Sequence, residues 1–323
     1  MWRFLRQLTA VIIVTIITMG GAAAEVYPSA PVTWIVPFTA GGITDGSSRA
    51  FAEDISKTIS QPVIVENRGG AGGTIGTEFA AHAKPNGYTV LYGTQATMAA
   101  APYMLKATKY DALRDFVPVY GISKMYTLIV VKADSPYKTL EQLIAAAKAN
   151  PGKLVYGSAG IGTATHLLME MLLKAAHIEM NHVPYPGAAK MMTDLLGGRL
   201  DVVLDYGTVA QQVSAGKLRV LGTNGPVRHP LYPDLPTVAE AGYPEATGET
   251  FQMLFVPAGT PKDRIDTLEN AMKKAMSSKK VLAYLDSMGA VPFKISGKDA
   301  QAYVKAQVAS WKKAIDDAGI PRQ

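Results

Sequence analysis

Two glycine-containing segments of the chain offer backbone N–H groups to a bound anion. Residues 37–45 run Pro-Phe-Thr-Ala-Gly-Gly-Ile-Thr-Asp and residues 157–163 run Gly-Ser-Ala-Gly-Ile-Gly-Thr; they are termed the first and second glycine loops. Glycines let the backbone approach a ligand closely, and free N–H groups at a following helix N-terminus favour negative charge without Arg or Lys. A carboxylate fits such a site. The alternative is that the glycines only turn the chain and the hydroxyl groups only cap a helix.

The candidate ligand-binding residues lie in or near these loops. Those of the first glycine loop are Phe38, Thr39, Ala40, Gly41, Gly42, Thr44 and Asp45, and those of the second are Ser158, Ala159, Gly160, Gly162 and Thr163. His166, in the first turn after Thr163, either caps that turn or points toward the ligand. Asp205 ends a predicted strand on the ligand side, where its carboxylate can bond a loop or a ligand hydroxyl.

Three acidic residues also admit other roles. Asp45 lies beside the proposed anion site, where one carboxylate repels another, so we expect it to hold the loop by accepting backbone N–H bonds. Contact with the ammonium group of an amino-acid ligand is the alternative. Asp201 and Asp205 project from one face of a strand pattern, as an acid–base pair would. Because Asp201 opens that strand and Asp205 ends it, we expect them to act separately.

Motifs of the common enzyme classes are missing from the sequence. No G-x-S-x-G elbow surrounds Ser158, because Gly157 and Tyr156 precede it, and no Gly-Lys pair is followed by Ser or Thr as in a P-loop. The glycine-rich run at 69–76 fails the dinucleotide-binding register. The histidines show no metal-ligand spacing. We therefore expect no catalytic residues, no cofactor and no metal; an enzymatic alternative would use Ser158 with His166.

Short β-rich runs alternate with helical patterns beyond Glu25, which is typical of βαβ units and a largely parallel sheet. A length of 323 residues allows about two domains, so we predict two α/β domains. Helices are predicted after Asp45 and after Thr163, and over 264–276 and 299–317. The predicted strands are 32–36, 63–66, 89–92, 128–131, 154–156, 180–183, 202–204, 220–222 and 253–256.

The N-terminus predicts export. Arg3 and Arg6 supply positive charge, residues 8–19 form an apolar run, and three alanines precede Glu25, as in a secretory signal cleaved after Ala24. The apolar run is too short for the alternative, a membrane anchor.

The chain has no cysteine, hence no lipid-attachment site and no disulfide. The net charge is +6 without a basic run, which argues against nucleic acid as a partner.

Short motifs follow one another in a characteristic order. They are IVPF at 35–38, QPVIVENR at 61–68, PNGYT at 85–89, YGSAG at 156–160, HVPY at 182–185, DLLGG at 194–198 and PAGTP at 257–261. In these motifs and their spacing the chain resembles the extracytoplasmic solute receptors of tripartite tricarboxylate transporters, often called the Bug family. The resemblance covers essentially the whole chain beyond the signal sequence.

The resemblance implies an α/β fold of the type II periplasmic-binding class, with two α/β domains joined by two crossovers and a ligand cleft between them. Carried over by position, residues 1–24 are a signal peptide, domain 1 is 25–125 plus 250–323, and domain 2 is 126–249. In the family, the two glycine loops grip one carboxylate from opposite domains, largely through backbone amides and partly through water. The opposite end of the cleft sets ligand identity, and there this chain departs from the common pattern at Gln95, Met98, Phe251 and Met253.

The expected function is therefore non-catalytic: a monomeric periplasmic solute-binding protein captures a small organic carboxylate and delivers it to the membrane subunits of a tripartite tricarboxylate-type transporter, docking to them transiently. Two alternatives remain open at this point. One is an exported α/β enzyme that acts on a carboxylate or an ester. The other is a ligand-sensing receptor that docks to a signalling protein. The identity of the carboxylate stays open as well.

Overall fold

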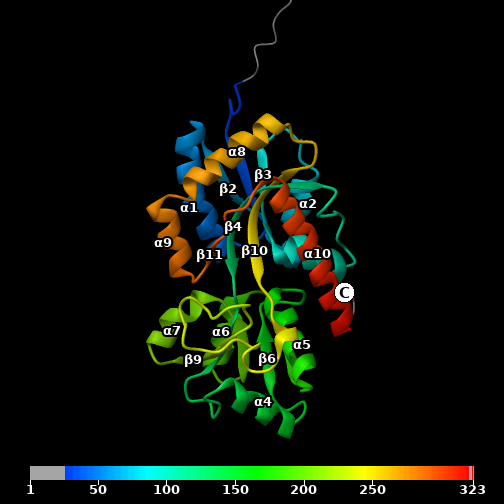
Figure 1. The fold of residues 1–323 in the computed structure, drawn as a ribbon, viewed down its shortest axis with the longest axis vertical. Helices are drawn as coiled ribbons and strands as arrows, with labels where there is room; N and C mark the ends of the chain where they lie inside the picture. Colours follow the sequence, from blue (N-terminus) through cyan, green and yellow to red (C-terminus); the bar gives the residue numbers. More distant parts are fainter. Residues whose placement is uncertain (1–25, 320–321, 323) are drawn as a thin grey trace, which may run out of the picture.

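Two mixed β-sheets organise the computed structural model, which describes residues 26–319 and 322. Each sheet forms the centre of one lobe, and the lobes lie one above the other in Figure 1. Within the described residues, the first sheet has six strands in the order β11-β4-β10-β3-β1-β2 and the second has five in the order β7-β6-β8-β5-β9.

The strands have the following bounds. The first sheet contains β1 (Val32–Val36), β2 (Val63–Asn67), β3 (Thr89–Thr94), β4 (Phe116–Met125), β10 (Thr250–Pro257) and β11 (Val291–Pro292). The second contains β5 (Leu128–Lys132), β6 (Val155–Ser158), β7 (Asn181–Pro184), β8 (Val202–Asp205) and β9 (Leu218–Thr223). All nine predicted strands are confirmed, with ends that differ by a few residues, whereas β4 and β11 were not predicted.

Helices cover both faces of each sheet, as the burial of apolar side chains on both faces requires. One face of the first sheet packs against α1 (Ile43–Ile59), α8 (Lys262–Ala275) and α9 (Lys279–Ser287), and the other against α2 (Thr74–Ala81), α3 (Ala101–Met104) and α10 (Gly297–Ala318). The second sheet lies between α4 (Leu140–Ala149) with α5 (Ala164–Ala176) and α6 (Ala188–Leu196) with α7 (Ala210–Ser214). Short helical turns occupy Ala71–Gly73, Ala96–Ala100, Gly207–Val209 and Pro244–Ala246.

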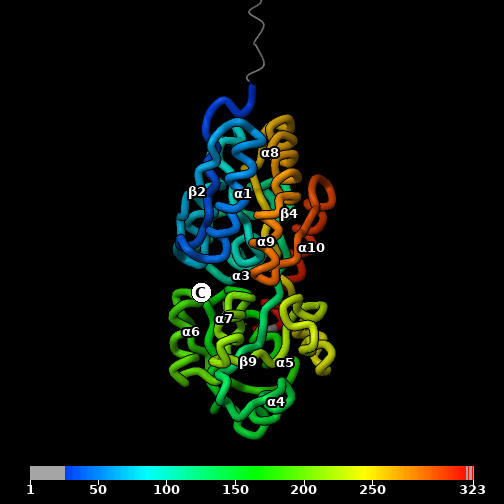
Figure 2. The backbone as a smooth tube through the Cα atoms, turned by 90° about the vertical axis from the view of Figure 1, so that its left-hand side faces the viewer, coloured from blue at the N-terminus to red at the C-terminus, as the bar shows by residue number. Residues whose placement is uncertain are grey.

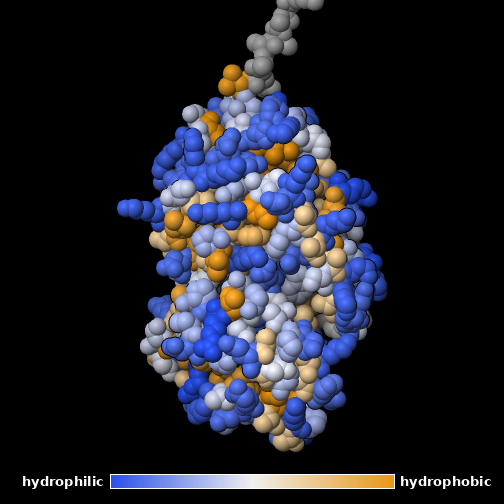
Figure 3. All heavy atoms as spheres, in the orientation of Figure 1, coloured by the Kyte–Doolittle hydropathy of each residue, from blue (hydrophilic) through white to orange (hydrophobic). Residues whose placement is uncertain are grey.

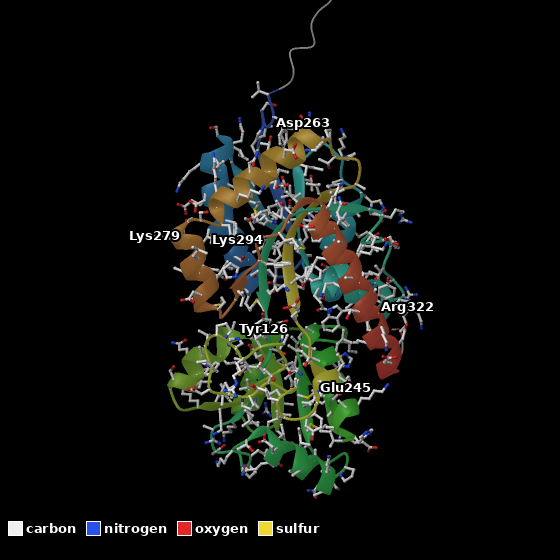
Figure 4. All side chains as sticks on the ribbon, in the orientation of Figure 1. Tyr126, Glu245, Asp263, Lys279, Lys294 and Arg322 are labelled. Carbon is white, nitrogen blue, oxygen red and sulfur yellow. The ribbon has the colours of Figure 1, made fainter. Side chains whose placement is uncertain are left out.

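Two crossovers join the lobes and lie side by side. The first runs from Met125 at the end of β4 to Leu128 at the start of β5, and Tyr126 lies at the junction between the lobes in Figure 4. The second leads from β9 to β10. The crossovers are tied together: Thr223 Oγ1 donates to Thr127 O at 2.7 Å, and Thr250 Oγ1 donates to Met125 O at 3.2 Å.

The sheets are less parallel than predicted. β1 pairs in parallel with β2 and β3, and β6 with β7 and β8, but β10 runs antiparallel to β3 and β4, and β5 runs antiparallel to β8 and β9. The cause is the crossover. Strands of βαβ units end at the boundary between the lobes, whereas β5 and β10 enter their lobes from that boundary and run the other way.

β4 escaped prediction because Pro118 and Gly121 interrupt its apolar pattern, and neither residue is typical of a central strand. The structure accommodates them with irregularities in the pairing: the register against β10 shifts between Gln252 and Met253, and again between Leu254 and Phe255. Such bulges are where a strand tolerates a residue that lacks an N–H group.

The C-terminal helix reaches across the boundary. α10 packs on the first sheet and also contacts α5 of the second lobe: Figure 1 shows it running down one side of the first lobe to the level of the second, and in the turned view of Figure 2 it lies mostly behind the other elements. The face in Figure 3 is mostly hydrophilic, with apolar residues in scattered spots.

Among the described helices, none combines the length and the apolar character that crossing a bilayer requires. The predicted signal sequence and its cleavage site lie outside the described residues.

Candidate functional site

A cleft of about 550 Å³ lies between the two lobes, where the strand-to-helix loops of both sheets meet. The first lobe lines it with Phe38, Thr39, Gly41, Gly42, Ile43, Thr44, Thr94, Gln95, Ala96, Met125, Thr250 and Gln252. The second lobe lines it with Ala159, Thr163, Ala164, Thr165, Gly187, Ala188, Ala189, Met192, Asp205, Tyr206, Thr208, Val209 and Gln212.

The first glycine loop presents the N-terminus of α1 to this cleft. The N–H groups in the first turn of any helix have no intrahelical acceptor. Gly42, the N-cap residue of α1, has no side chain that could accept from them instead. Ile43 and Thr44 of that turn line the cleft. An anion placed here would meet free N–H groups and the positive end of the helix dipole.

Asp45 braces the first glycine loop from behind. Its Oδ2 accepts a hydrogen bond from Gly41 N at 2.9 Å, and its Oδ1 accepts one from Arg49 Nε at 2.9 Å. Burial acts to raise the pKa of Asp45, but the hydrogen bonds from Arg49 and Gly41 outweigh burial and hold the pKa below its usual range. Both oxygens are engaged in holding the loop, and Asp45 itself does not line the cleft.

The second glycine loop presents the N-terminus of α5 from the opposite lobe. Thr163 is the N-cap residue and its side chain makes no capping hydrogen bond, while Ala164 and Thr165 of the first turn line the cleft. Three other N–H groups of this loop are already engaged by neighbouring side chains. These bonds are Ala159 N to Thr165 Oγ1 at 3.0 Å, Gly160 N to Ser158 Oγ at 3.3 Å and Gly162 N to His166 Nδ1 at 3.3 Å.

Three stacked aromatic rings pack against the second glycine loop. His182 stacks between Tyr156 and His166, with ring centroids 4.6 and 4.4 Å away. Its Nε2 lies 2.7 Å from Ser158 Oγ. Burial lowers the pKa of both imidazoles to about 4, so both are neutral near pH 7. A neutral His166 keeps Nδ1 as an acceptor for Gly162.

The structure separates the predicted site residues into two groups. Those that line the cleft are Phe38, Thr39, Gly41, Gly42, Thr44, Ala159, Thr163 and Asp205. Those that do not line the cleft are the exposed Ala40 and the residues that brace the loops or form their turns, namely Asp45, Ser158, Gly160, Gly162 and His166. Lining residues that sequence reasoning missed include Thr165, Gln252 and the N-terminus of α6. The last of these follows the HVPY motif, which could have signalled it.

Three of the four residues expected to set ligand identity lie elsewhere. Met98, Phe251 and Met253 are fully buried in the core, and only Gln95 lines the cleft. Side chains alternate along a strand, so β10 directs Phe251 and Met253 into the core and Thr250 and Gln252 toward the cleft. The expectation that Met98, Phe251 and Met253 form the opposite end of the cleft is therefore wrong.

The pair that the enzymatic alternative would use, Ser158 with His166, is not formed in the structure. Ser158 contacts His182, which comes from β7, and not His166. Ser158 is fully buried and does not line the cleft. Glu170 bonds the hydroxyl of Tyr156, and no described carboxylate accepts a hydrogen bond from His182. This arrangement supports a loop and lacks the access that a nucleophile needs.

The cleft is poor in charge. Of the described residues that line it, Asp205 alone is ionisable within the physiological range. Burial raises the pKa of Asp205 to about 6, against the lowering effect of hydrogen bonds from Thr208 and Tyr206. Across residues 26–319, no group of three or more His, Cys, Asp or Glu side chains gathers as a metal site would require.

Comparison with known proteins assigns the family. Residues 47–320 match the model of the tripartite tricarboxylate transporter family receptor, and the chain belongs to this family. The protein BugT of Bordetella pertussis is 32% identical over 97% of this chain and 98% of its own length. The Bug-family resemblance is thereby confirmed.

Solved structures confirm the fold class and its two-lobed α/β architecture. The periplasmic binding protein BugD superposes with a TM-score of 0.83 at 35% identity, over 92% of this chain and all of its own. A Rhodopseudomonas palustris protein solved with adipate gives 0.84 at 32% identity, over 91% and 98% of the two chains. MatC of the same organism, solved with bound malate, gives 0.81 at 28% identity, over 90% and 100%.

Proposed function

We propose that this chain is a periplasmic receptor that binds one small organic carboxylate in the cleft between its lobes and delivers it to the membrane subunits of a tripartite tricarboxylate-type transporter. The observation that carries the proposal is the pair of uncapped helix N-termini, α1 and α5, that open into one cleft from opposite lobes. Two such termini supply hydrogen-bond donors and partial positive charge without a cationic side chain. The carboxylates bound by the relatives solved with adipate and malate support the ligand class.

The proposal also covers the division of the chain into two domains and the compartment in which the protein works. Domain 1 comprises 25–125 plus 250–323 and domain 2 comprises 126–249, so that each crossover is a hinge. The receptor works as a monomer that docks to its transporter only transiently, in a non-catalytic role, after export and cleavage behind Ala24. Periplasmic binding proteins among its relatives support the location.

Gly42 offers a direct test of the carboxylate site. Its backbone angles, φ −83° and ψ 176°, suit any residue, and an added Cβ would meet only Thr39 O at 3.6 Å. Asp is a good N-cap residue. Gly42→Asp should therefore cap α1, occupy its free N–H groups with a tethered carboxylate, and repel a ligand carboxylate. The matched control is Ser278→Asp, which puts the same charge at the uncapped N-terminus of α9.

The measurement is a thermal-shift screen of the purified mature protein against a panel of carboxylates, followed by titration calorimetry of the hits. We expect Gly42→Asp to keep its unfolding midpoint within a few degrees and to lose at least ~100-fold in affinity, as the loss of two charge-assisted hydrogen bonds implies. Ser278→Asp should bind like the parent. A folded Gly42→Asp protein with unchanged affinity would refute the proposed site.

A further inference from the structure

Asp205 is held in the cleft by one of its two carboxylate oxygens. Oδ1 accepts hydrogen bonds from Tyr206 N at 2.6 Å and from the Thr208 hydroxyl. Oδ2 receives no hydrogen bond from any described residue, although the side chain lines the cleft. The turn that follows β8 therefore uses one oxygen, and the second remains available to a ligand.

Among the described residues, the carboxylate of Asp205 lacks a cationic neighbour. The residue is 3% exposed, and the described salt bridges of residues 26–319 do not include it. No Lys, Arg or His occurs among the described residues that line the cleft. A buried charge is costly unless it is paired or hydrogen-bonded, and the pKa of Asp205, raised to about 6 by burial, reflects that cost. A hydrogen-bond donor on the ligand would offset it.

The strand register places Asp205 beside the second glycine loop. β6 and β8 run in parallel, with Tyr156 opposite Val202 and Gly157 opposite Val203. The same register, continued by two residues, brings Asp205 level with Ala159, which also lines the cleft. Adjacent strands lie about 4.8 Å apart. A group that meets Asp205 is thus about one strand spacing from the loop that faces the ligand carboxylate.

We propose that Asp205 is a specificity-determining residue, whose Oδ2 accepts a hydrogen bond from an ammonium or hydroxyl group on the carbon next to the bound carboxylate. The ligand class is then α-amino and α-hydroxy acids. This inference rests on the proposed function, because it takes the carboxylate to lie at the two helix N-termini. A substituent on the carbon next to the carboxylate lies two bonds from the carboxylate carbon, which is close enough to reach the next strand. An unsubstituted acid leaves Asp205 unpaired beside a second negative charge.

Members of the family differ in the carboxylate with which they were solved. One R. palustris relative was solved with adipate, which has no α-substituent, and another with malate, which has a hydroxyl group. The fold accommodates both ligands, so discrimination belongs to individual side chains. In this chain the Asp205 oxygen that accepts no hydrogen bond from a described residue is a charged atom positioned to discriminate.

Three matched five-carbon diacids test the inference: L-glutamate, L-2-hydroxyglutarate and glutarate. We expect calorimetric affinities of the wild-type protein to fall in that order, with glutarate about 10-fold to 100-fold weaker than glutamate, the range of one hydrogen bond to a charged group. Asp205→Asn should compress this ratio to within about threefold. The control Asp201→Asn alters the far end of the same strand, where Asp201 Oδ2 bonds Val155 N at 2.7 Å, and should leave the ratio unchanged.

The ratio of the glutamate and glutarate affinities separates a role in specificity from a merely structural role, since a damaged fold weakens the binding of all three ligands together. If Asp205→Asn does not fold, the wild-type ratio at pH 7.5 and 5.5 decides instead: protonation of Asp205 should reduce the preference for glutamate. Equal affinity of the wild-type protein for all three acids, or an unchanged ratio in a folded Asp205→Asn variant, overturns the inference while the proposed function stands. Failure of every carboxylate to bind overturns both.

Discussion

Three histidines in this protein, of which His166 and His229 are buried and His182 is half-buried, are held neutral by the fold. His166 accepts a hydrogen bond from Gly162 N at 3.3 Å, His182 contacts Ser158, and His229 accepts one from Leu231 N at 3.2 Å. Burial lowers the pKa of each to about 4. At His182, repulsion from a proton on the stacked His166 lowers the pKa further, whereas nearby Glu170 acts to raise it.

This arrangement predicts that stability falls as the pH falls from about 6.5 to 4. Unfolded imidazoles take up protons near pH 6.5 while the folded ones resist, so each contributes stability that is present above 6.5 and lost below it, at up to about 1.4 kcal/mol per pH unit. Asp205 acts in the opposite direction, because its raised pKa favours the folded protein at lower pH, but it is one group against three.

Urea unfolding at pH 7, 6 and 5 measures the effect. His166→Asn should lessen the decline, because the amide oxygen can accept the Gly162 N–H bond and does not titrate. A free energy of unfolding that stays level between pH 7 and 5 would show that the imidazoles are charged in the folded protein.

At the scale of elements, the neighbouring strands β4 and β10 each belong to a crossover, and a buried side-chain hydrogen bond joins them. Ser123 Oγ donates to Gln252 Oε1 at 2.7 Å, and both side chains are almost fully buried. Gln252 is also one of the residues through which β10 lines the cleft. The bond therefore couples the cleft wall to the strand that leads into the second lobe.

Gln252→Leu should destabilise the protein by about 1–3 kcal/mol, because the Ser123 hydroxyl loses its acceptor while it remains buried. Removing both polar groups in Ser123→Ala/Gln252→Leu should cost less than the two single changes together. Urea unfolding of the four proteins gives this coupling energy. Strictly additive costs would mean that the bond contributes nothing specific to the packing of β4 on β10.

At the scale of the whole molecule, the lobes touch on both sides of the crossovers. Besides α10 on α5, Gly207 of the second lobe packs so closely against Met288 of the first that an added Cβ would lie 2.2 Å from Met288 O. Within residues 26–319 two crossovers are the covalent links between the lobes, so the lobes can close on a ligand by changes in the backbone near Met125 and Thr250.

We expect the radius of gyration, measured by small-angle scattering, to decrease when a carboxylate identified by the thermal-shift screen saturates the receptor. The physical reason is that the ligand satisfies N–H groups on both lobes only when they approach each other. The apo protein at the same concentration is the reference. No decrease at saturation would count against hinge closure and would favour binding to a cleft of fixed width.

The part of the fold that depends on neighbours along the chain could be predicted from the amino-acid sequence. Apolar alternation and helical spacing are local, so β1, β5 and α5 could be located from them, and so could the two strand–glycine turn–helix segments. The order of the short motifs along the chain likewise indicated the family. Segments that break a local pattern were missed, as Pro118 and Gly121 in β4 show.

Which side chains meet follows from the packing of the folded chain and could not be predicted. It brought His182 rather than His166 to Ser158, because stacking on Tyr156 depends on the pairing of β6 with β7. It turned Phe251 into the core and Gln252 toward the cleft, since the register of β10 between β3 and β4 sets which face each residue takes. And it left one oxygen of Asp205 without a donor among the described residues, in a cleft that none of them lines with a cationic side chain. Such contacts join residues far apart in the chain, and no local pattern encodes them.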